Sequence, residues 1–245
     1  MAKGPTNNPG SPSSGDQPMG VKIAIGVALV VVLAAIVVFA VKDSGGEKVN
    51  TVAFQNATIT GASLPAMPDG EAVPSSDPAV GQTIPTVVGK TFDGSTVEIK
   101  PGKAQLIAII AHWCPHCQKE VPLIVGWQKS GEITKDLHIT AVSTAAEEAK
   151  GNYPPASWLD REEWKNPVLV DTPTSKVLSA FGATGFPTLI AVTADGKVAQ
   201  RASGELTLDQ VKVLVNAALG KKPDSTATTV PGTTPITSPV PTSAP

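Results

Sequence analysis

Two cysteines, Cys114 and Cys117, are the residues of this 245-residue chain whose type and spacing point most directly to chemistry, and they are its only cysteines. They lie in the stretch "AHWCPHCQKEVP", residues 111–122, where Pro115 and His116 separate them. A CxxC pair can be half of a zinc site, a structural disulfide or a redox-active dithiol. Other residues of the sequence indicate which of these three kinds of site is present.

A zinc site and a purely structural disulfide are both disfavoured. Structural zinc takes four ligands, and beyond the two sulfurs the chain offers only His112, His116 and His138, with no second CxxC. A disulfide that closes so short a loop constrains little unfolded-state entropy, because its stabilisation grows with loop length. The sequence therefore favours a redox-active disulfide between Cys114 and Cys117, with no metal and no separate cofactor.

The elements around the cysteines support the redox interpretation. The run "AQLIAIIAHW", residues 104–113, is continuously apolar, which is typical of a strand buried on both faces. A helix is expected from Cys114 towards Lys129. Unpaired amides and the dipole at the start of a helix stabilise negative charge, which raises the thiolate fraction. Cys114 is thus placed for attack, and Cys117, one turn further on, to resolve the mixed disulfide.

The other predicted elements alternate between strands and helices. Two short strands flank an Asp-Gly turn in residues 86–99, and strands follow at 137–144 and 167–171. A helix is predicted at 173–182, a hairpin at 187–201, and a closing helix at 207–220 that begins with a capping box. This order predicts an α/β domain, with a mixed β-sheet flanked by helices.

Two motifs together resemble the thioredoxin superfamily, and more closely its membrane-anchored, extracytoplasmic TlpA/ResA-like branch. The segment "WCPHCQKEVP" matches the W-C-x-x-C-x-x-E-x-P pattern of that branch, and "GFPT" puts Pro187 where the family keeps a cis-proline. The similarity extends over roughly residues 79–220. It implies a thioredoxin-like fold and thiol-disulfide oxidoreductase activity.

The resemblance also implies roles for single residues. Pro187 would be cis and lie against the cysteines, leaving the backbone of Phe186 to pair with a substrate peptide, and Trp113 would join this substrate-binding surface. Glu120 would manage protons during exchange. Simpler alternatives stay open: Pro187 as a proline at a strand start, and Glu120 as a solvated helix residue.

Two departures from thioredoxin bear on the chemistry. Thioredoxin has a buried acid six residues before its first cysteine, and Ala108 stands there, so proton handling falls to Glu120, His116 or water. The dipeptide Pro115-His116 is that of the oxidant DsbA, and a histidine there can stabilise the thiolate and so favour oxidation of substrates. TlpA/ResA-like proteins, by contrast, are usually reductases.

Single residues and the net charge also favour or disfavour other functional classes. A Cu(I) chaperone could use the cysteine pair with His112 or His116, because Cu(I) prefers soft ligands. Peroxidase activity is disfavoured because Ala111 replaces the threonine that peroxiredoxins place three residues before their cysteine. The net charge of -2 and the lack of a basic cluster argue against a nucleic-acid partner.

The regions outside the predicted domain suggest a membrane anchor. Residues 23–41 are apolar and uncharged, long enough to cross a bilayer and longer than the apolar region of a signal peptide. We expect a disordered tail at 1–20, a transmembrane helix at 21–42, a linker at 43–80, the thioredoxin-like domain at 81–221 and a disordered Thr/Ser/Pro-rich tail at 222–245.

The expected protein is therefore a single-pass membrane protein whose C-terminal domain lies outside the cytoplasm, where disulfides persist. Lysines balance across the span, so the orientation rests on the redox chemistry. Its expected partners are substrate proteins with cysteines and a separate redox protein, because a third cysteine is absent. The expected direction is reduction, with a DsbA-like oxidant as the alternative and a Cu(I)-binding chaperone as a further one.

Overall fold

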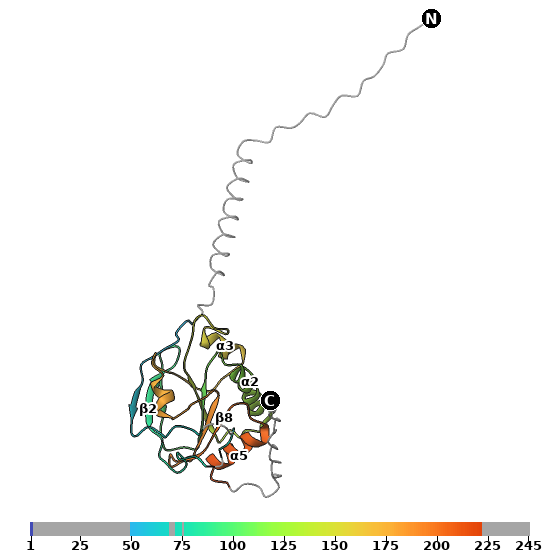
Figure 1. The fold of residues 1–245 in the computed structure, drawn as a ribbon. Coiled ribbons are helices and arrows are strands. Elements are labelled where there is room, and N and C mark those ends of the chain that lie inside the picture. Colours follow the sequence, from blue (N-terminus) through green and yellow to red (C-terminus); the bar gives the residue numbers. More distant parts are fainter. Residues whose placement is uncertain (2–49, 69–71, 75, 222–245) are drawn as a thin grey trace, which may run out of the picture. The chain divides into compact units, whose positions relative to one another are not determined.

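A computed structural model describes residue 1 and residues 50–68, 72–74 and 76–221 (Figure 1). The predicted transmembrane helix and the predicted C-terminal tail lie outside these residues. Among the helices that are described, none is both long and apolar enough to span a bilayer.

The described strands form one mixed sheet. They are β1 (Thr58–Thr60), β2 (Thr86–Lys90), β3 (Thr96–Ile99), β4 (Gln105–Ile110), β5 (His138–Ser143), β6 (Val168–Val170), β7 (Thr188–Val192) and β8 (Val198–Ser203). Their order is β1-β2-β6-β5-β4-β7-β8, and β3 pairs with β2. Each strand predicted from residue 86 onward is present, and β1 lies at the edge beside β2.

The centre of the sheet has the thioredoxin arrangement. Strand β4 pairs in parallel with β5 on one side and antiparallel with β7 on the other, and β7 pairs antiparallel with β8. The order β5-β4-β7-β8, with β7 running against its neighbours, is the four-stranded core of a thioredoxin-like fold. The predicted mixed sheet is therefore confirmed.

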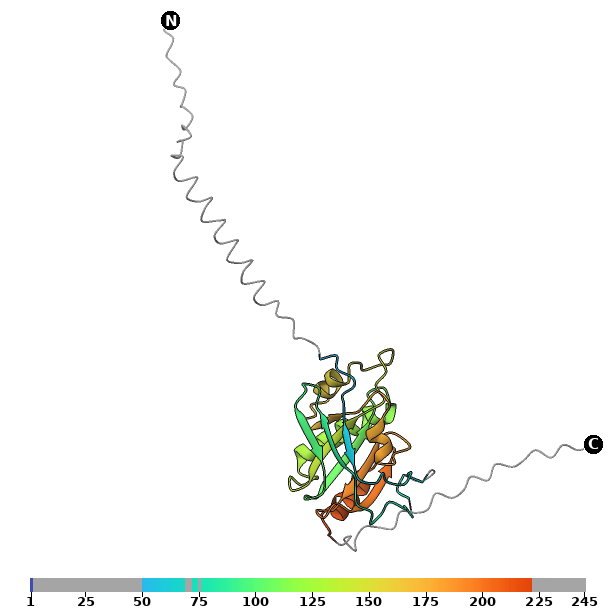
Figure 2. The same cartoon turned by 90° about the vertical axis from the view of Figure 1, so that its left-hand side faces the viewer.

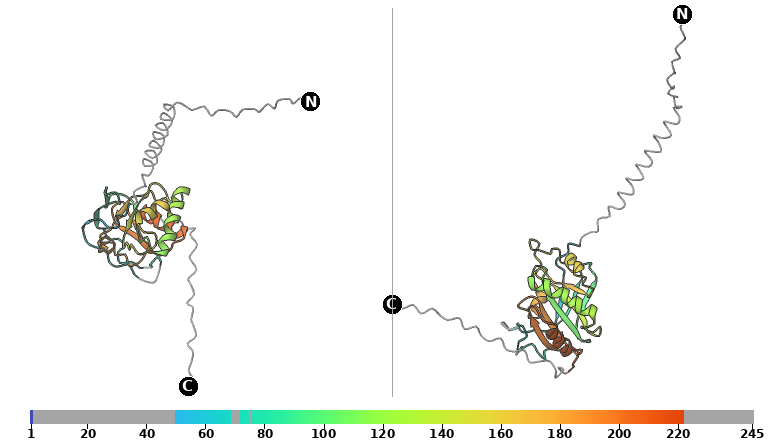
Figure 3. Two further views of the ribbon diagram at one scale, coloured as in Figure 1. Left: turned by 90° about the horizontal axis from the view of Figure 1, so that it is seen from above. Right: turned by 90° about the vertical axis from the view of Figure 1, so that its right-hand side faces the viewer.

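Helices cover both faces of this sheet. They are α2 (Pro115–Ser130), α3 (Pro155–Arg161), α4 (Lys176–Ala180) and α5 (Leu208–Ala218). Alternate residues of β4 point to opposite faces: Leu106 joins the cluster under α2, α3 and α5, and Ile107 joins the cluster under α4. Figure 3 (right) looks onto the side of α2 and α5, and Figure 2 onto the side of β2.

The ends of α2 and α5 follow from their sequences. Pro115 is the first residue of α2, where its missing N–H costs nothing, and Gly131 ends the helix with a left-handed backbone. The predicted capping box of α5 is present: the Thr207 side chain accepts from the Gln210 N–H, and the Gln210 side chain accepts from the Thr207 N–H.

The described part of the segment assigned to a linker differs from a free spacer. Its Leu64 and Met67 are buried, and β1 pairs with β2. Arg201 of β8, a fully buried side chain, also holds this segment, because it donates to both carboxylate oxygens of Asp77 and to the carbonyl of Pro65. A buried arginine requires such partners, so this part of the chain packs as part of the folded unit.

Candidate active site

The first cysteine lies where the central strand turns into a helix. Strand β4 ends at Ile110, and Cys114 caps the start of α2. The Cys114 N–H donates to the Ala111 carbonyl, which closes the turn between the two elements. This is the position expected from the sequence.

The two thiols differ in access. Cys114 is 5% exposed, whereas Cys117 is 0% exposed. The Cys114 thiol donates to the carbonyl of Phe186 at 3.5 Å, and Cys117 Sγ accepts from the Ala111 N–H at 3.5 Å. Only Cys114 therefore offers surface to an approaching sulfur atom.

Burial sets the protonation of Cys117. It raises the pKa of the thiol far above its usual range, outweighing the Ala111 hydrogen bond, and charge on Cys114 and Glu120 raises it further. Cys117 consequently keeps its proton until a nearby base removes it. Since the thiolate is the nucleophile, this sulfur needs a proton acceptor before it can react.

Glu120 is a buried acid with one unpaired oxygen. The side chain is 0% exposed, and its Oε2 accepts from the Leu206 N–H at 3.1 Å, while Oε1 has no hydrogen-bond partner. Burial raises the pKa of this carboxyl to about 7, against the Leu206 bond. An acid with this pKa can both take up and release a proton at neutral pH. Burial argues against the alternative of a solvated helix residue.

The loop before β7 forms the opposite wall of the site. The peptide bond between Phe186 and Pro187 is cis, as the resemblance implied. The Pro187 carbonyl accepts from the Gly204 N–H and from the Ser203 hydroxyl, which fix the loop to the end of β8. The Phe186 carbonyl, expected to be free for a substrate, is engaged by the Cys114 thiol. Ionisation of Cys114 would release it, because a thiolate cannot donate.

Trp113 lies beside this loop. Its ring meets the Phe186 ring edge-to-face, with centroids 5.9 Å apart, and its indole N–H donates to the Ala145 carbonyl at 2.7 Å. Lys150 Nζ lies 5.7 Å from the centroid of the indole ring. Two half-buried aromatic rings thus lie against one another beside Cys114.

His116 is exposed and points to a partner that the sequence did not suggest. Its Nδ1 lies 2.7 Å from Glu205 Oε1, and Lys119 Nζ donates to the same oxygen at 2.9 Å. The Lys119 hydrogen bond, followed by that of His116, lowers the pKa of Glu205. Glu205 and Leu206 are the site residues that sequence reasoning missed. They carry no motif, and only the capping box at Thr207 marks where their loop ends.

His112, named as a copper ligand in the alternative interpretation, is occupied by the backbone. Its Nε2 accepts from the Glu147 N–H at 3.0 Å, so Nδ1 carries the proton and donates to the Gly151 carbonyl at 2.8 Å. Burial lowers the pKa of this imidazole. Within the described part of the chain, no three His, Cys, Asp or Glu side chains are grouped so as to hold a metal ion.

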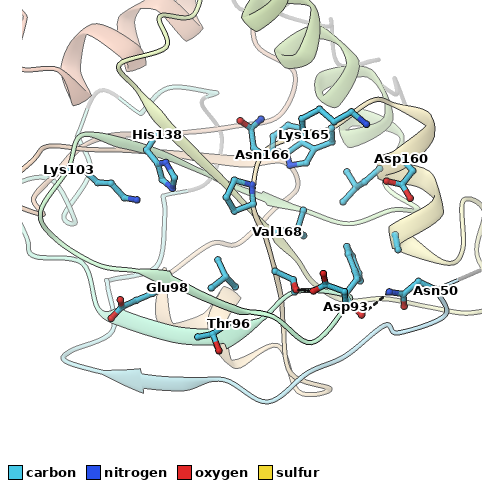
Figure 4. Close-up of a pocket in the computed structure, with 17 residues that line it drawn as sticks. Asn50, Asp93, Thr96, Glu98, Lys103, His138, Asp160, Lys165, Asn166 and Val168 are labelled. Atoms are coloured by element: carbon cyan, nitrogen blue, oxygen red, sulfur yellow. Dashed lines mark hydrogen bonds between the residues drawn. The ribbon is translucent and has the colours of Figure 1, made fainter.

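A pocket lies away from the cysteines. Figure 4 shows its 17 lining residues, and none of the predicted site residues is among them. They come from Asn50, the turn between β2 and β3, β3 itself, Lys103, the start of β5, and the chain from α3 to the start of β6. His138 and Lys103 lie on one side and Glu98 and Thr96 on the other. Its mixture of charges favours no class of ligand.

Two curated proteins are similar to this chain in sequence. Thiol-disulfide oxidoreductase ResA of Bacillus thuringiensis subsp. konkukian is 24% identical over 135 residues, which cover 54% of this chain and 75% of the relative. ResA of Geobacillus thermodenitrificans is 28% identical over 140 residues, covering 55% and 75%.

Solved structures and one family also match. A thiol:disulfide interchange protein of the thioredoxin family from Chlorobium tepidum has a TM-score of 0.47 and 25% identity, covering 56% of this chain and 96% of its own. StoA from Bacillus subtilis has a TM-score of 0.44 and 19% identity, covering 56% and 98%. The model of the Redoxin family matches residues 79–217, which is more than half of the sequence and includes both cysteines, Glu120 and Pro187. The chain belongs to the Redoxin family.

Proposed function

We propose that this chain, a thiol-disulfide oxidoreductase, works as a membrane-tethered reductase of protein disulfides outside the cytoplasm. One observation carries the chemistry: a slightly exposed Cys114 at the start of α2 precedes a fully buried Cys117, and Glu120, three residues further along α2 and also fully buried, has one unpaired carboxylate oxygen. These are a nucleophile, a resolving thiol and a proton acceptor. The Cys114–Cys117 pair is itself the redox group, with no further cofactor.

In the reducing direction, the Cys114 thiolate attacks one sulfur of a substrate disulfide. A bond forms between that sulfur and Cys114, the substrate S–S bond breaks, and the other substrate sulfur leaves as a thiolate. Cys117 then gives its proton to Glu120, and its sulfur attacks Cys114 Sγ. The Cys114–Cys117 disulfide forms, the second substrate thiolate leaves, and the substrate has gained the two electrons that the chain has lost.

Substrate binding is assigned to the wall around Cys114. Phe186 and Pro187 supply backbone beside the nucleophile, and Trp113 supplies an aromatic surface at the same place. An extended segment around the substrate disulfide would pair with the Phe186 carbonyl once the Cys114 thiol has ionised. A separate dithiol protein must then restore the reduced form, because the chain has no third cysteine.

The short connection between β5 and β6 supports a reductase of substrate disulfides over an oxidant of substrate thiols. Between β5 and β6 the chain carries α3, a helix of 7 residues, where a DsbA-like oxidant would carry a larger helical insertion. His116 favours the alternative of an oxidant, since a histidine between the two cysteines can stabilise the thiolate. The Cu(I) alternative has less support, because both ring nitrogens of His112 are engaged by the backbone.

Trapping of the mixed disulfide tests the roles proposed for the two cysteines. Reduced full-length protein with Cys117→Ser should accumulate a mixed disulfide with a disulfide-bonded peptide, because the resolving thiol is missing. The matched Cys114→Ser variant should form none, and the unaltered chain should turn over to free peptide thiols. Trapping by Cys114→Ser instead would reverse the assigned roles.

The membrane topology is proposed from residues 21–42, which lie outside the described part of the structure, and from the site of disulfide chemistry. In a chain with both native cysteines changed to serine, Ser243→Cys should react with a membrane-impermeant thiol reagent in intact cells. Ser13→Cys, on the other side of the predicted span, should react only after lysis. The reverse pattern would place the domain in the cytoplasm.

A further inference from the structure

The connection between β8 and α5 contacts three separate parts of the site. We call residues Gly204–Leu206 the β8–α5 loop. The Gly204 N–H donates to the Pro187 carbonyl, Glu205 accepts from Lys119 and lies against His116, and the Leu206 N–H donates to Glu120. Three successive residues thus contact the cis-proline loop, the exposed side of α2 and the buried acid.

Glu205 is the charged member of this loop. Its Oε1 is shared by His116 Nδ1 at 2.7 Å and Lys119 Nζ at 2.9 Å, and its side chain is 38% exposed. His116 lies between the two cysteines in the sequence, at the second position of α2. The carboxylate therefore fixes the imidazole that is nearest to the dithiol along the chain and places a negative charge beside it.

Charge at this position acts on the redox equilibrium. A cation near Cys114 stabilises the thiolate, and since only the reduced form has a thiolate, it makes the disulfide more oxidising. An anion at the same place, such as the carboxylate of Glu205, has the opposite effect. The sequence departs from thioredoxin at His116 towards the oxidant DsbA, and Glu205 is placed to offset this departure.

We propose that Glu205 is a positioning residue that holds His116 and lowers the reduction potential of the Cys114–Cys117 pair. This rests on the proposed function, because it concerns the direction in which the same dithiol works. The pairing of Glu205 with His116 allows a Pro-His dipeptide to operate in a reductase.

The redox equilibrium between the chain and glutathione measures the effect of Glu205 on the reduction potential. One oxidised chain and two glutathione thiols give one reduced chain and one glutathione disulfide, so two electrons pass to the Cys114–Cys117 pair. The variant is Glu205→Gln, whose amide oxygen can still accept a hydrogen bond while the charge is lost. The matched control is Glu163→Gln, because Glu163 is also exposed and pairs with a lysine of α2, Lys129, at the far end of the helix.

Glu205→Gln in the full chain should shift the equilibrium constant about threefold towards the dithiol, as expected for one exposed charge in a highly polar surrounding. By the relation between potential and equilibrium constant, this corresponds to about 14 mV. Glu163→Gln should leave the constant unchanged. Raising the salt to about 1 M, where the screening length falls to about 3 Å, should remove most of the shift.

A second pair of variants tests whether Glu205 acts through His116. His116→Ala should move the equilibrium towards the disulfide, and Glu205→Gln should have a smaller effect in that background. A shift that persists at high salt and without His116 would instead come from displacement of Leu206, and would overturn the proposal. An equal constant for Glu205→Gln and the unaltered chain would also overturn it. If the unaltered chain shows no redox transition, the proposed function itself fails.

Discussion

Two buried carboxyl groups of this molecule, Asp77 and Glu120, have opposite surroundings. Both oxygens of Asp77 accept from Arg201, at 2.5 and 2.7 Å, whereas Glu120 accepts one backbone N–H and leaves Oε1 without a partner. Burial tends to raise both pKa values. The bonds from Arg201 and the Ala79 N–H outweigh burial at Asp77 and lower its pKa, while burial dominates at Glu120 and raises its pKa to about 7.

These different surroundings give the two acids different roles. A buried acid that is fully paired stays ionised and ties two parts of the chain together, which for Asp77 are the segment before β2 and strand β8. An incompletely paired acid costs stability when it ionises and is poised to exchange protons near neutral pH. Glu120 is therefore the functional member of the two.

The largest expected effect comes from breaking the structural pair. Arg201→Met leaves the Asp77 carboxylate buried without its partner and should lower the free energy of unfolding by about 3 to 5 kcal/mol, measured by urea denaturation. Adding Asp77→Asn should restore part of the loss, because no charge then remains buried. The folded fraction should still trap a peptide when combined with Cys117→Ser. A loss below about 1 kcal/mol would mean that the pair is not buried.

Removing the functional acid should affect the rate of the resolving step. Glu120→Gln cannot take the proton from Cys117, so release of the mixed disulfide should slow about 100-fold, the usual contribution of a general base. Rapid-quench analysis of a single turnover separates this step from the first attack. Attack by Cys114 should change little. Equal slowing of both steps would argue against a role for Glu120 in the second step alone.

The same substitution should change how stability depends on pH. The pKa of Glu120 is raised on folding from 4.5 to about 7, so the unfolded chain loses this proton first and the folded state is destabilised as pH rises through that window. Between about pH 5 and pH 8 the unaltered chain should lose about 2 kcal/mol relative to Glu120→Gln. Urea denaturation at both pH values measures the difference. Parallel stability curves would mean that Glu120 titrates normally.

The smallest expected effect is on stability and comes from changing Thr207, the residue after the β8–α5 loop. Thr207→Ala removes the cap of α5 and should cost about 1 kcal/mol of unfolding free energy, whereas Thr207→Ser should cost less because it keeps the hydroxyl. Thermal denaturation compares the two variants. A large change in the reduction potential of Thr207→Ala would show that the loop geometry, rather than the charge of Glu205, controls the dithiol.

The sequence predicted those parts of the fold and site that depend on local patterns. The buried strand before Cys114 follows from a short apolar run, and the helix after it from the CxxC segment, whereas the cis bond at Pro187 was implied by the family resemblance. The burial of Glu120 also had a signal, since position 120 lies on the stripe formed by Cys117, Val121 and Ile124 on α2.

Other features depend on contacts between distant residues, which local patterns do not reveal. Glu205 lies 89 positions from His116, and Asp77 lies 124 positions from Arg201. The apolar residues of the segment before β2 are too sparse to show a period, so its packing was not predicted. Helix α4 starts later than predicted, at Lys176, because Ser175 before it has a left-handed backbone, with φ of 52°.

The reduction potential of the full chain in detergent, equilibrated against glutathione with Cys114→Ser as the control, tests the direction of electron flow most directly. A reductase should have a value close to that of thioredoxin, about −270 mV. A value close to that of DsbA, about −120 mV, would contradict this and would mean that His116 determines the direction and that the protein inserts disulfides.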